Sequence, residues 1–307
     1  MAVSRHMALV ANAKAGALLA EPGGATSLQS LLQDAAGKLD IIPEDAGTLP
    51  ERIALAQATG AELVVIAGGD GSVACAAGHL AGTQAALGLI PCGTMNLLAR
   101  DLGLDPADRS AAIHALANGP IISIDAGTVS GGAEEHLFLC ASMLGTPARL
   151  SRHREAGRQR GNGLLAWAGF ARAAAIALVR NRSLRFTLRI DGQTRQCRIP
   201  SLTIVVNALD DRSGRMFGRT RLDGGRLVLY LVHRASVARQ IWLMLRAAIT
   251  GSLRAPEIEV IEAQSVEVDV ADAALHVLVD GEMRLLAPPL RYSIRPGLLR
   301  VAAPPAA

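Results

Sequence analysis

Two glycine-bearing segments of this 307-residue sequence carry the residues best suited to chemistry on a phosphate. In the first, Gly68, Gly69, Asp70, Gly71 and Ser72 follow the apolar run LVVIA. Glycines let backbone N–H groups approach an anion closely, and a helix that begins there adds partial positive charge. A carboxylate among such amides repels a phosphate unless it binds Mg²⁺, accepts a proton or positions a nucleophile. Asp70 is therefore predicted to have one of these roles, and a plain turn with a capping Asp is the alternative.

The second segment, Pro91 to Asn96, follows the apolar run LGLIP and precedes a helical pattern. Gly93 permits a close approach of the backbone to a ligand, and Thr94 is expected to cap the helix while offering its hydroxyl to a phosphate. Asn96 is expected to hold backbone groups or the edge of a nucleotide. Because both segments follow strands of one open α/β sheet, we expect them together at the carboxyl edge of that sheet, where such sheets bind ligands.

Two other nucleotide-binding motifs are excluded. No segment has the spacing G-x-x-x-x-G-K-[ST] of a Walker A loop. The dinucleotide pattern fits only loosely at Gly69-x-Gly71-x-x-Ala74, and it follows the third predicted strand instead of the first. No acidic residue stands at the offset where a ribose ligand is required, since residues 88–91 there are GLIP. A dehydrogenase is therefore rejected.

Strand and helix patterns alternate in the first part of the chain and give way to strands after about Ile121. The predicted strands of the first part cover residues 7–11, 39–42, 63–67 and 87–91, and its predicted helices cover 26–38, 50–58, 73–80 and 95–102. In the second part we predict strands at 122–129, 136–143, 184–190, 198–207, 226–232, 265–270, 275–279 and 284–286, with helices only at 163–180 and 236–250. This order predicts an open α/β domain followed by a mainly antiparallel β domain.

The motifs GGDGS at residues 68–72 and P-x-G-T-x-N-x-x-A-R at residues 91–100 resemble the catalytic domain of diacylglycerol kinases, which sphingosine, ceramide and bacterial lipid kinases share. The resemblance extends over nearly the whole chain, through residues 124–127 (IDAG), 206–207 (VN), 278–282 (LVDGE) and 296–301 (PGLLRV). It implies a phosphofructokinase-like open α/β domain at 1–122 and a β-sandwich domain at 123–290, with the nucleotide in the cleft between them. It also implies that the segment 291–307 returns toward the first domain.

The resemblance also implies roles for individual residues, with ATP and Mg²⁺ as cofactors. Asp70 would lie near the metal and the reacting hydroxyl, Glu282 would accept the proton, and Asp223 would hold a structural Mg²⁺. The residues implied beside the nucleotide are Asn12, Gly16, Gly68, Gly69, Gly71, Ser72, Gly93, Thr94 and Asn96. Since Asp280-Gly281 is a hairpin dipeptide, it would present Glu282 at the end of two strands. An exposed turn glutamate without a role is the alternative.

The chain departs from the family pattern at several positions. Ala13 stands where the family has a proline, and Ala74-Cys75 where many members have Asn-Glu. The usual Asp-Asp-Gly is Leu222-Asp223-Gly224-Gly225 here, so the register of Asp223 is ambiguous by one residue. These departures keep a catalytically weak nucleotide or lipid sensor open as an alternative function.

Composition limits the partners and the setting. Aromatic residues make up only 3% of the chain, so a nucleic-acid partner, which would need stacking rings, is not expected. The four scattered cysteines and the absence of a secretory n-region predict a cytoplasmic protein. The apolar run 163–179 contains Arg172 and is shorter than a membrane span. The basic residues between Arg149 and Arg160 form either a solvated helix face or loop, or a peripheral contact with an anionic membrane at its cytoplasmic face, which a kinase acting on a membrane lipid would need.

The sequence thus predicts an ATP-dependent lipid kinase that transfers the γ-phosphoryl group to a hydroxyl of diacylglycerol or a related lipid. A sphingoid or ceramide kinase, an NAD kinase-like enzyme and the weak sensor are the alternatives. The GGDG loop also occurs in NAD kinases, but P-x-G-T-x-N-x-x-A-R and the late D-G-E favour the lipid kinase. The identity of the acceptor lipid and the existence of a homodimer are left open.

Overall fold

The chain divides into two compact units in a computed structural model that describes residues 5–12, 24–148, 183–210, 218–219, 221–233, 239, 242 and 255–305. The first unit contains Met1–Ala126 and Pro296–Ala307, and the second contains Gly127–Arg295. Two long strands, β5 (Ile121–Gly131) and β16 (Leu290–Ala302), contribute residues to both units. The first unit is α/β and the second is built of antiparallel strands, which confirms the predicted fold class.

The first unit is built on a parallel sheet whose strands lie in the order β2-β1-β3-β4. Their bounds are His6–Ala11 for β1, Lys38–Ile42 for β2, Leu63–Gly68 for β3 and Ala86–Pro91 for β4. β3 and β4 are buried along their whole length, which explains their continuous apolar sequences. The last part of β16 extends this sheet, because Val301 pairs in parallel with Leu87 of β4.

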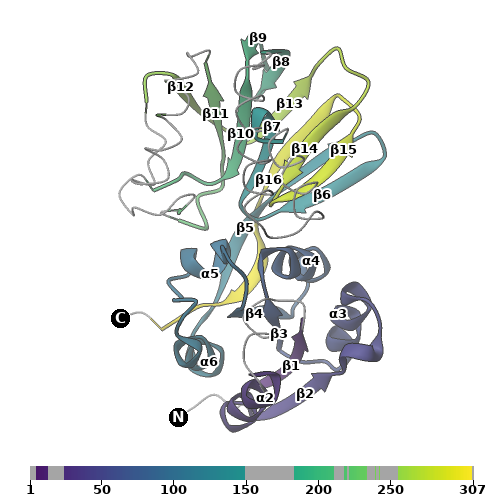
Figure 1. Cartoon of the computed structure of the whole chain (residues 1–307), viewed down its shortest axis with the longest axis vertical. Helices are drawn as coiled ribbons and strands as arrows, with labels where there is room; N and C mark the ends of the chain where they lie inside the picture. Colours follow the sequence, from purple (N-terminus) through teal and green to yellow (C-terminus); the bar gives the residue numbers. More distant parts are fainter. Residues whose placement is uncertain are drawn as a thin grey trace, which may run out of the picture. The chain divides into compact units, whose positions relative to one another are not determined.

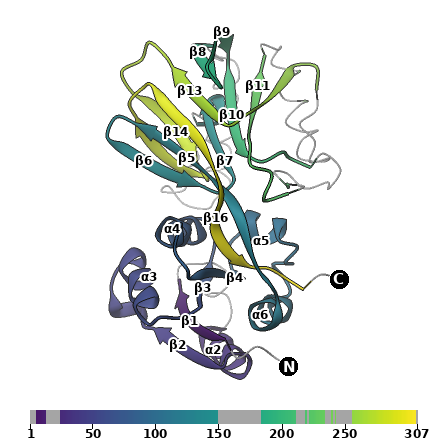
Figure 2. The ribbon, with the colours of Figure 1, turned by 180° about the vertical axis from the view of Figure 1, so that it is seen from behind.

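Helices cover both faces of this sheet (Figures 1 and 2). The described helices are α2 (Gly24–Ala35), α3 (Leu49–Ala58), α4 (Asp70–Leu80), α5 (Leu97–Asp101), α6 (Arg109–Asn118) and the 3-10 turn η1 (Glu44–Ala46). On one face α2 packs against α6, and Leu32 and Leu116 join Met7 and Leu63 in an apolar core. On the other face α3 packs against α4. The sheet therefore has helices packed on both of its faces.

Within the second unit, two sheets share one apolar core. The first places β13 between β16 and β8, with β9 at its edge, while β5 pairs with both β16 and β6. The second has the order β12-β11-β10-β7-β14-β15. Their bounds are β6 Glu134–Phe138, β7 Ala141–Gly145, β8 Leu184–Ile190, β9 Gln193–Ile199, β10 Ser201–Val206, β11 Leu227–Val232, β12 Ile258–Ala263, β13 Ser265–Asp269, β14 Leu275–Val279 and β15 Glu282–Leu286. Phe186 and Tyr292 of the first sheet meet Ile204 and Leu229 of the second in the core, as in a β-sandwich.

Two of the predicted strands are each divided in the structure. The strand predicted at 136–143 is β6 and β7, which break at Leu139-Cys140, where the backbone N–H groups turn toward Asp280. The strand predicted at 198–207 is β9 and β10, which part at Pro200 because proline has no N–H for a strand ladder. β12 was not predicted.

The predicted helix at 163–180 lies outside the described residues, as does most of the one at 236–250. Among the helices of the described ranges, none is both long and apolar enough to cross a membrane.

Candidate active site

Most of the GGDGS segment belongs to a helix and not to a loop. β3 ends at Gly68, Gly69 has an extended conformation at the N-cap, and α4 begins at Asp70, three residues earlier than predicted. Val73 makes the first backbone hydrogen bond of the helix, from its N–H to the carbonyl of Gly69. The N–H groups of residues 70–72 therefore have no partner within the helix, and they form the positive end that binds anions in other proteins.

Asn12 connects the end of β1 to this helix start. Its backbone N–H donates to the carbonyl of Ala67, and its Nδ2 donates to Ser72 Oγ at 2.8 Å. Ser72 is only 6% exposed. A Cβ at Gly68 would lie 2.7 Å from the Cβ of Ser72, so only glycine at position 68 leaves room for this seryl side chain. Gly16, also predicted beside the nucleotide, lies outside the described residues.

The second segment forms a tight turn closed by Asn96. Asn96 has a left-handed backbone conformation with a φ of 49° and is 5% exposed. Its Oδ1 accepts a hydrogen bond from the N–H of Gly93 at 2.9 Å, and its Nδ2 donates to the carbonyl of Gly93 at 2.7 Å. Cys92, which precedes the turn, is buried, and burial raises the pKa of its thiol.

Thr94 does not cap the following helix, contrary to the sequence prediction. Asn96 occupies the N-cap position of α5 and makes no capping bond with its own side chain. Thr94 instead lies exposed in the turn. The capping group of α5 comes from the GGDGS segment. Residue spacing within α5 could not indicate a cap that comes from a distant part of the chain.

Asp70 supplies that cap and joins the two segments. Its Oδ2 accepts from the backbone N–H of Asn96 at 2.8 Å, and its Oδ1 accepts from the N–H of Leu97 at 2.6 Å. Beside it the two backbones touch, since a Cβ at Gly93 would lie 2.6 Å from the Cα of Gly69. Asp70, Gly69, Gly93 and Asn96 are thus brought together, and we call this arrangement the loop clamp.

Arg52 is a further residue at this edge that the sequence did not indicate. It is 6% exposed, although it is a charged residue on a helix that covers the sheet. One of its guanidinium nitrogens donates to the carbonyl of Ala11 at 2.6 Å. Arg52 therefore fixes the end of β1 directly before Asn12.

Glu282 and Asp280 lie in the second unit, on the hairpin that joins β14 to β15. Asp280 and Gly281 have φ values of 44° and 88°, and Val279 pairs with Glu282, as in a two-residue hairpin with a type I′ turn. Glu282 is the first residue of β15, and its exposed carboxylate forms an ion pair with Arg284. The hairpin therefore presents this carboxylate to solvent at its end.

Asp280 anchors that hairpin to the break between β6 and β7. Its carboxylate accepts hydrogen bonds from the backbone N–H groups of Leu139, Cys140 and Ala141 at 2.5, 2.9 and 2.9 Å, and its own N–H donates to the carbonyl of Ala141. Burial raises the pKa of the Asp280 carboxyl, against the opposing effects of these three bonds and of the charge on Arg219. Sequence reasoning used Asp280 only as a turn former and missed this anchoring.

Asp223 pairs with a neighbouring arginine instead of with other acidic residues. Arg221 donates to both of its carboxylate oxygens, at 3.0 and 3.2 Å, and this bond lowers the pKa of Asp223. Within the residues that the structure describes, no three His, Cys, Asp or Glu side chains come close enough together to hold a metal ion. The basic residues predicted at a membrane, 149–160, lie outside the described part of the chain.

Comparison with known proteins gives these motifs a context. Residues 6–129 match the family described as "Diacylglycerol kinase catalytic domain", and residues 143–303 match "YegS C-terminal NAD kinase beta sandwich-like domain". This chain belongs to the diacylglycerol kinase catalytic-domain family. Its first part, residues 6–129, therefore corresponds to the catalytic domain of this lipid kinase family.

Individual relatives are more distant. The chain is 38% identical over 91 residues to proteins named diacylglycerol kinase in two strains of Mycobacterium tuberculosis, a match that covers 30% of this chain and 29% of theirs. The crystal structure of a diacylglycerol kinase from Bacillus anthracis is 17% identical and covers 97% of both chains with a TM-score of 0.68. At this identity the structural similarity extends to the fold alone.

Proposed function

We propose that this family member is an ATP-dependent lipid kinase that transfers the γ-phosphoryl group to a hydroxyl of diacylglycerol or a related lipid. The loop clamp carries the proposal. Asp70 holds the turn Gly93–Asn96 against the start of α4, whose residues 70–72 offer N–H groups without helical partners. Phosphoryl transfer depends mainly on positioning and on neutralising charge, and a rigid set of such donors supplies both.

Asp70 fits a role beside a divalent cation that arrives with ATP. Each of its oxygens accepts one backbone N–H and keeps further acceptor capacity, because an ionised carboxylate has about four acceptor directions. A bound Mg²⁺ would neutralise charge on the phosphates. The chain's own contribution is to hold the carboxylate and the amides in one fixed arrangement.

A structural Mg²⁺ at Asp223 has less support. Both carboxylate oxygens face Arg221, whose positive charge disfavours a cation at the same place. We therefore give Asp223 no part in the proposed reaction.

Glu282 is the proposed proton acceptor for the attacking lipid hydroxyl. Its carboxylate is half exposed and pairs with Arg284 at the protein surface, so a substrate can reach it. A base has to reach the hydroxyl as it attacks the γ-phosphate. Asp280 would support this role by fixing the hairpin that carries Glu282.

The acceptor is proposed to be reached at an anionic membrane, with the basic residues of 149–160 in contact with the surface from the cytoplasmic side. Such residues contribute about 1 kcal/mol each near an anionic leaflet. A protein that sediments with anionic and neutral vesicles alike would contradict this part of the proposal.

The test is incubation of the protein with γ-labelled ATP and Mg²⁺ in mixed micelles that contain diacylglycerol, ceramide, a sphingoid base or undecaprenol. We expect a labelled phospholipid from at least one acceptor, and its loss in Glu282→Gln but not in Glu135→Gln, which alters an exposed glutamate of β6. A parallel reaction with NAD distinguishes an NAD kinase. Absence of any labelled product would leave the weak sensor as the better function.

A further inference from the structure

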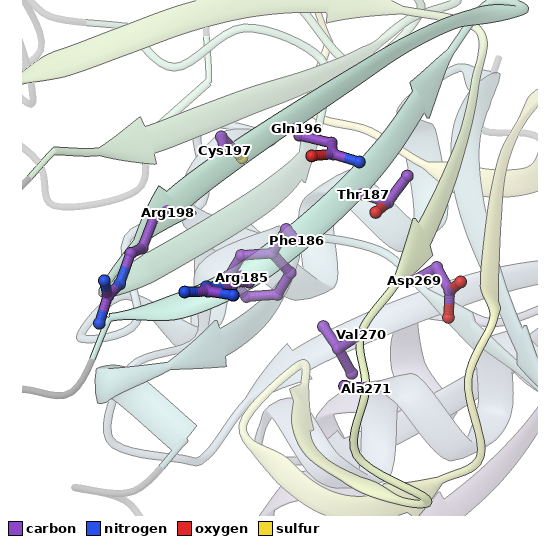
Figure 3. A pocket seen from close by; sticks show the side chains of 9 residues that line it. All are labelled: Arg185, Phe186, Thr187, Gln196, Cys197, Arg198, Asp269, Val270 and Ala271. Carbon is purple, nitrogen blue, oxygen red and sulfur yellow. The ribbon is translucent and has the colours of Figure 1, made fainter.

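A second polar site lies on the outer face of the β-sandwich unit, where β8, β9 and β13 are neighbours (Figure 3). It is a cavity of about 640 Å³, within the size range of small-molecule sites. The lining residues are Arg185, Phe186, Thr187, Gln196, Cys197, Arg198, Asp269, Val270 and Ala271. It shares no residue with the loop clamp or the Glu282 hairpin.

Two arginines that line this cavity occupy directly opposed positions on neighbouring strands. Arg185 of β8 pairs directly with Arg198 of β9 across the antiparallel ladder, so both side chains leave the sheet on the same face. That face is the outer one, since the alternate residues Phe186 and Leu188 are in the core. Like charges in directly opposed positions destabilise a sheet, and among the described strands β9 lies at the edge of its sheet, with β8 as its neighbour.

The other arginines of these two strands have carboxylate partners. Arg189 lies 3.3 Å from Glu267, and Arg195 forms two bonds to Glu259 at 2.5 and 2.8 Å. Neither Arg185 nor Arg198 forms an ion pair with any residue in the described part of the chain. The repulsion between them is therefore left without a counter-charge from these residues.

Neutral and acidic groups complete the same face. Thr187 and Gln196 are the next directly opposed pair along β8 and β9, and Asp269 of β13 lies opposite Thr187 on the other side. In Figure 3 the guanidinium groups lie at one end of the cavity and the carboxylate at the other, with the threonine and glutamine between them. The face thus offers donors for an anion and, at a distance from them, an acceptor for a hydroxyl.

We propose that this cavity binds a phosphate ester that carries hydroxyl groups. Arg185 and Arg198 would hold the phosphate oxygens between them, Thr187 and Gln196 would add neutral donors, and Asp269 would accept from a hydroxyl of the ligand. Guanidinium groups are the preferred protein partners of phosphate because their N–H donors match its geometry. The ligand is either a free phosphorylated polyol or the headgroup of an anionic phospholipid, which share this chemistry.

The test measures binding without ATP and without turnover, so that its outcome is independent of the proposed kinase activity. One arm titrates glycerol 3-phosphate by calorimetry, and the other measures co-sedimentation with phosphatidylcholine vesicles with and without phosphatidylglycerol. The site variant combines Arg185→Gln and Arg198→Gln. Its matched control, Arg189→Gln with Arg195→Gln, removes the same charge from the same two strands.

We expect the site variant to bind at least about tenfold more weakly in one arm and the control variant to change by less than about threefold. If only glycerol 3-phosphate binds in a way that the site variant loses, the site takes a free polyol phosphate. If only the phosphatidylglycerol vesicles do, it takes a lipid headgroup, because the contact proposed for residues 149–160 is the same in both variants. Asp269→Asn should weaken binding of glycerol 3-phosphate more than that of inorganic phosphate. Without ligand, the site variant should unfold at a higher temperature than the wild type, because the opposed charges are gone.

Two results would overturn the proposal. One is the absence of binding in both arms. The other is an equal loss of binding in the site and control variants, which would mean that diffuse surface charge, and not this cavity, attracts the anion.

Discussion

Asp70 caps a helix to which it does not belong, because its Oδ2 accepts the backbone N–H of Asn96, the N-cap residue of α5, at 2.8 Å. The two residues come from the segments that follow adjacent parallel strands, β3 and β4, and Asp70 is the first residue of α4. Asn96 in turn closes its own loop through two bonds to Gly93. The two motifs that resemble the kinase family are thus parts of one hydrogen-bonded structure, and a change in either one is expected to affect the other.

Asp70→Asn is expected to loosen this structure as well as to reduce turnover. The amide that replaces one oxygen would place an N–H donor against the N–H of Asn96 or Leu97, and the loss of such a bond costs about 1–3 kcal/mol. We expect a lower free energy of unfolding in urea and weaker binding of ATP by calorimetry. Asp34→Asn, an exposed change on α2, is the control and should alter neither. Wild-type stability of Asp70→Asn would show that the clamp contributes nothing measurable.

Gly93→Ala tests the contact between the two backbones. The added Cβ would lie 2.6 Å from the Cα of Gly69, so one loop has to move, and such overpacking costs about 1–3 kcal/mol. We expect ATP binding to weaken strongly. Gly78→Ala in α4 meets no atom within 4 Å and should be neutral or stabilising by up to about 1 kcal/mol, because alanine favours a helix interior. The same thermal unfolding and ATP titrations compare both variants. Equal behaviour of the two would contradict the proposed packing.

In the first unit, the sequence predicted that the two glycine-bearing segments lie together at one edge of the sheet. It did not predict the hydrogen bonds between them. The apolar runs that end at Gly68 and Pro91 identified two buried parallel strands, and strands of one parallel sheet end at one edge. The bonds of Asp70 to residues 96 and 97 could not be predicted, because they join separate elements and depend on the start of α4 three residues early. Threonine favours helix N-cap positions, so Thr94 was predicted to cap α5. In the structure, the carboxylate of Asp70 accepts the N–H of Leu97 at the start of that helix instead.

In the second unit, Asp280 likewise makes contacts with a distant segment that its local sequence does not predict. Its place before Gly281 predicted a hairpin turn correctly, since the turn requires positive φ at both positions. Its three bonds to residues 139–141 lie about 140 positions away along the chain and leave no local pattern. These bonds also explain why the strand predicted at 136–143 is divided into β6 and β7.

The pH dependence of unfolding should contain a contribution from Asp280. Burial raises the pKa of this carboxyl above its usual 3.8, so between the unfolded and the native pKa the native protein binds more protons than the unfolded chain. The contribution of Asp280 to stability is therefore fully present below the unfolded pKa and falls as the pH rises through the raised native pKa. Asp280→Asn should be less stable throughout, because it loses an acceptor, but should have a flatter slope above about pH 4. Urea unfolding at a series of pH values measures this slope, and Asp272→Asn, in an exposed turn, should keep it. An unchanged slope in Asp280→Asn would mean that this carboxyl is ionised in both states.

Substitutions at Glu282 and Arg284 separate the chemistry of the hairpin from its fold. Both side chains are about half exposed and pair with each other at the start of β15, so neither is needed for the core, and such exposed pairs contribute at most about 1 kcal/mol to stability. If Glu282 accepts the proton of the lipid hydroxyl, Glu282→Gln should lower kcat by about 100-fold or more while the unfolding temperature stays near that of the wild type. Arg284→Gln removes the ion pair but keeps the carboxylate, and should therefore retain most of the activity.

Steady-state kinetics with labelled ATP and diacylglycerol micelles compare the two variants. If Arg284→Gln lost as much activity as Glu282→Gln, the ion pair and not the base would be the element that matters, and the proton acceptor would have to be sought elsewhere.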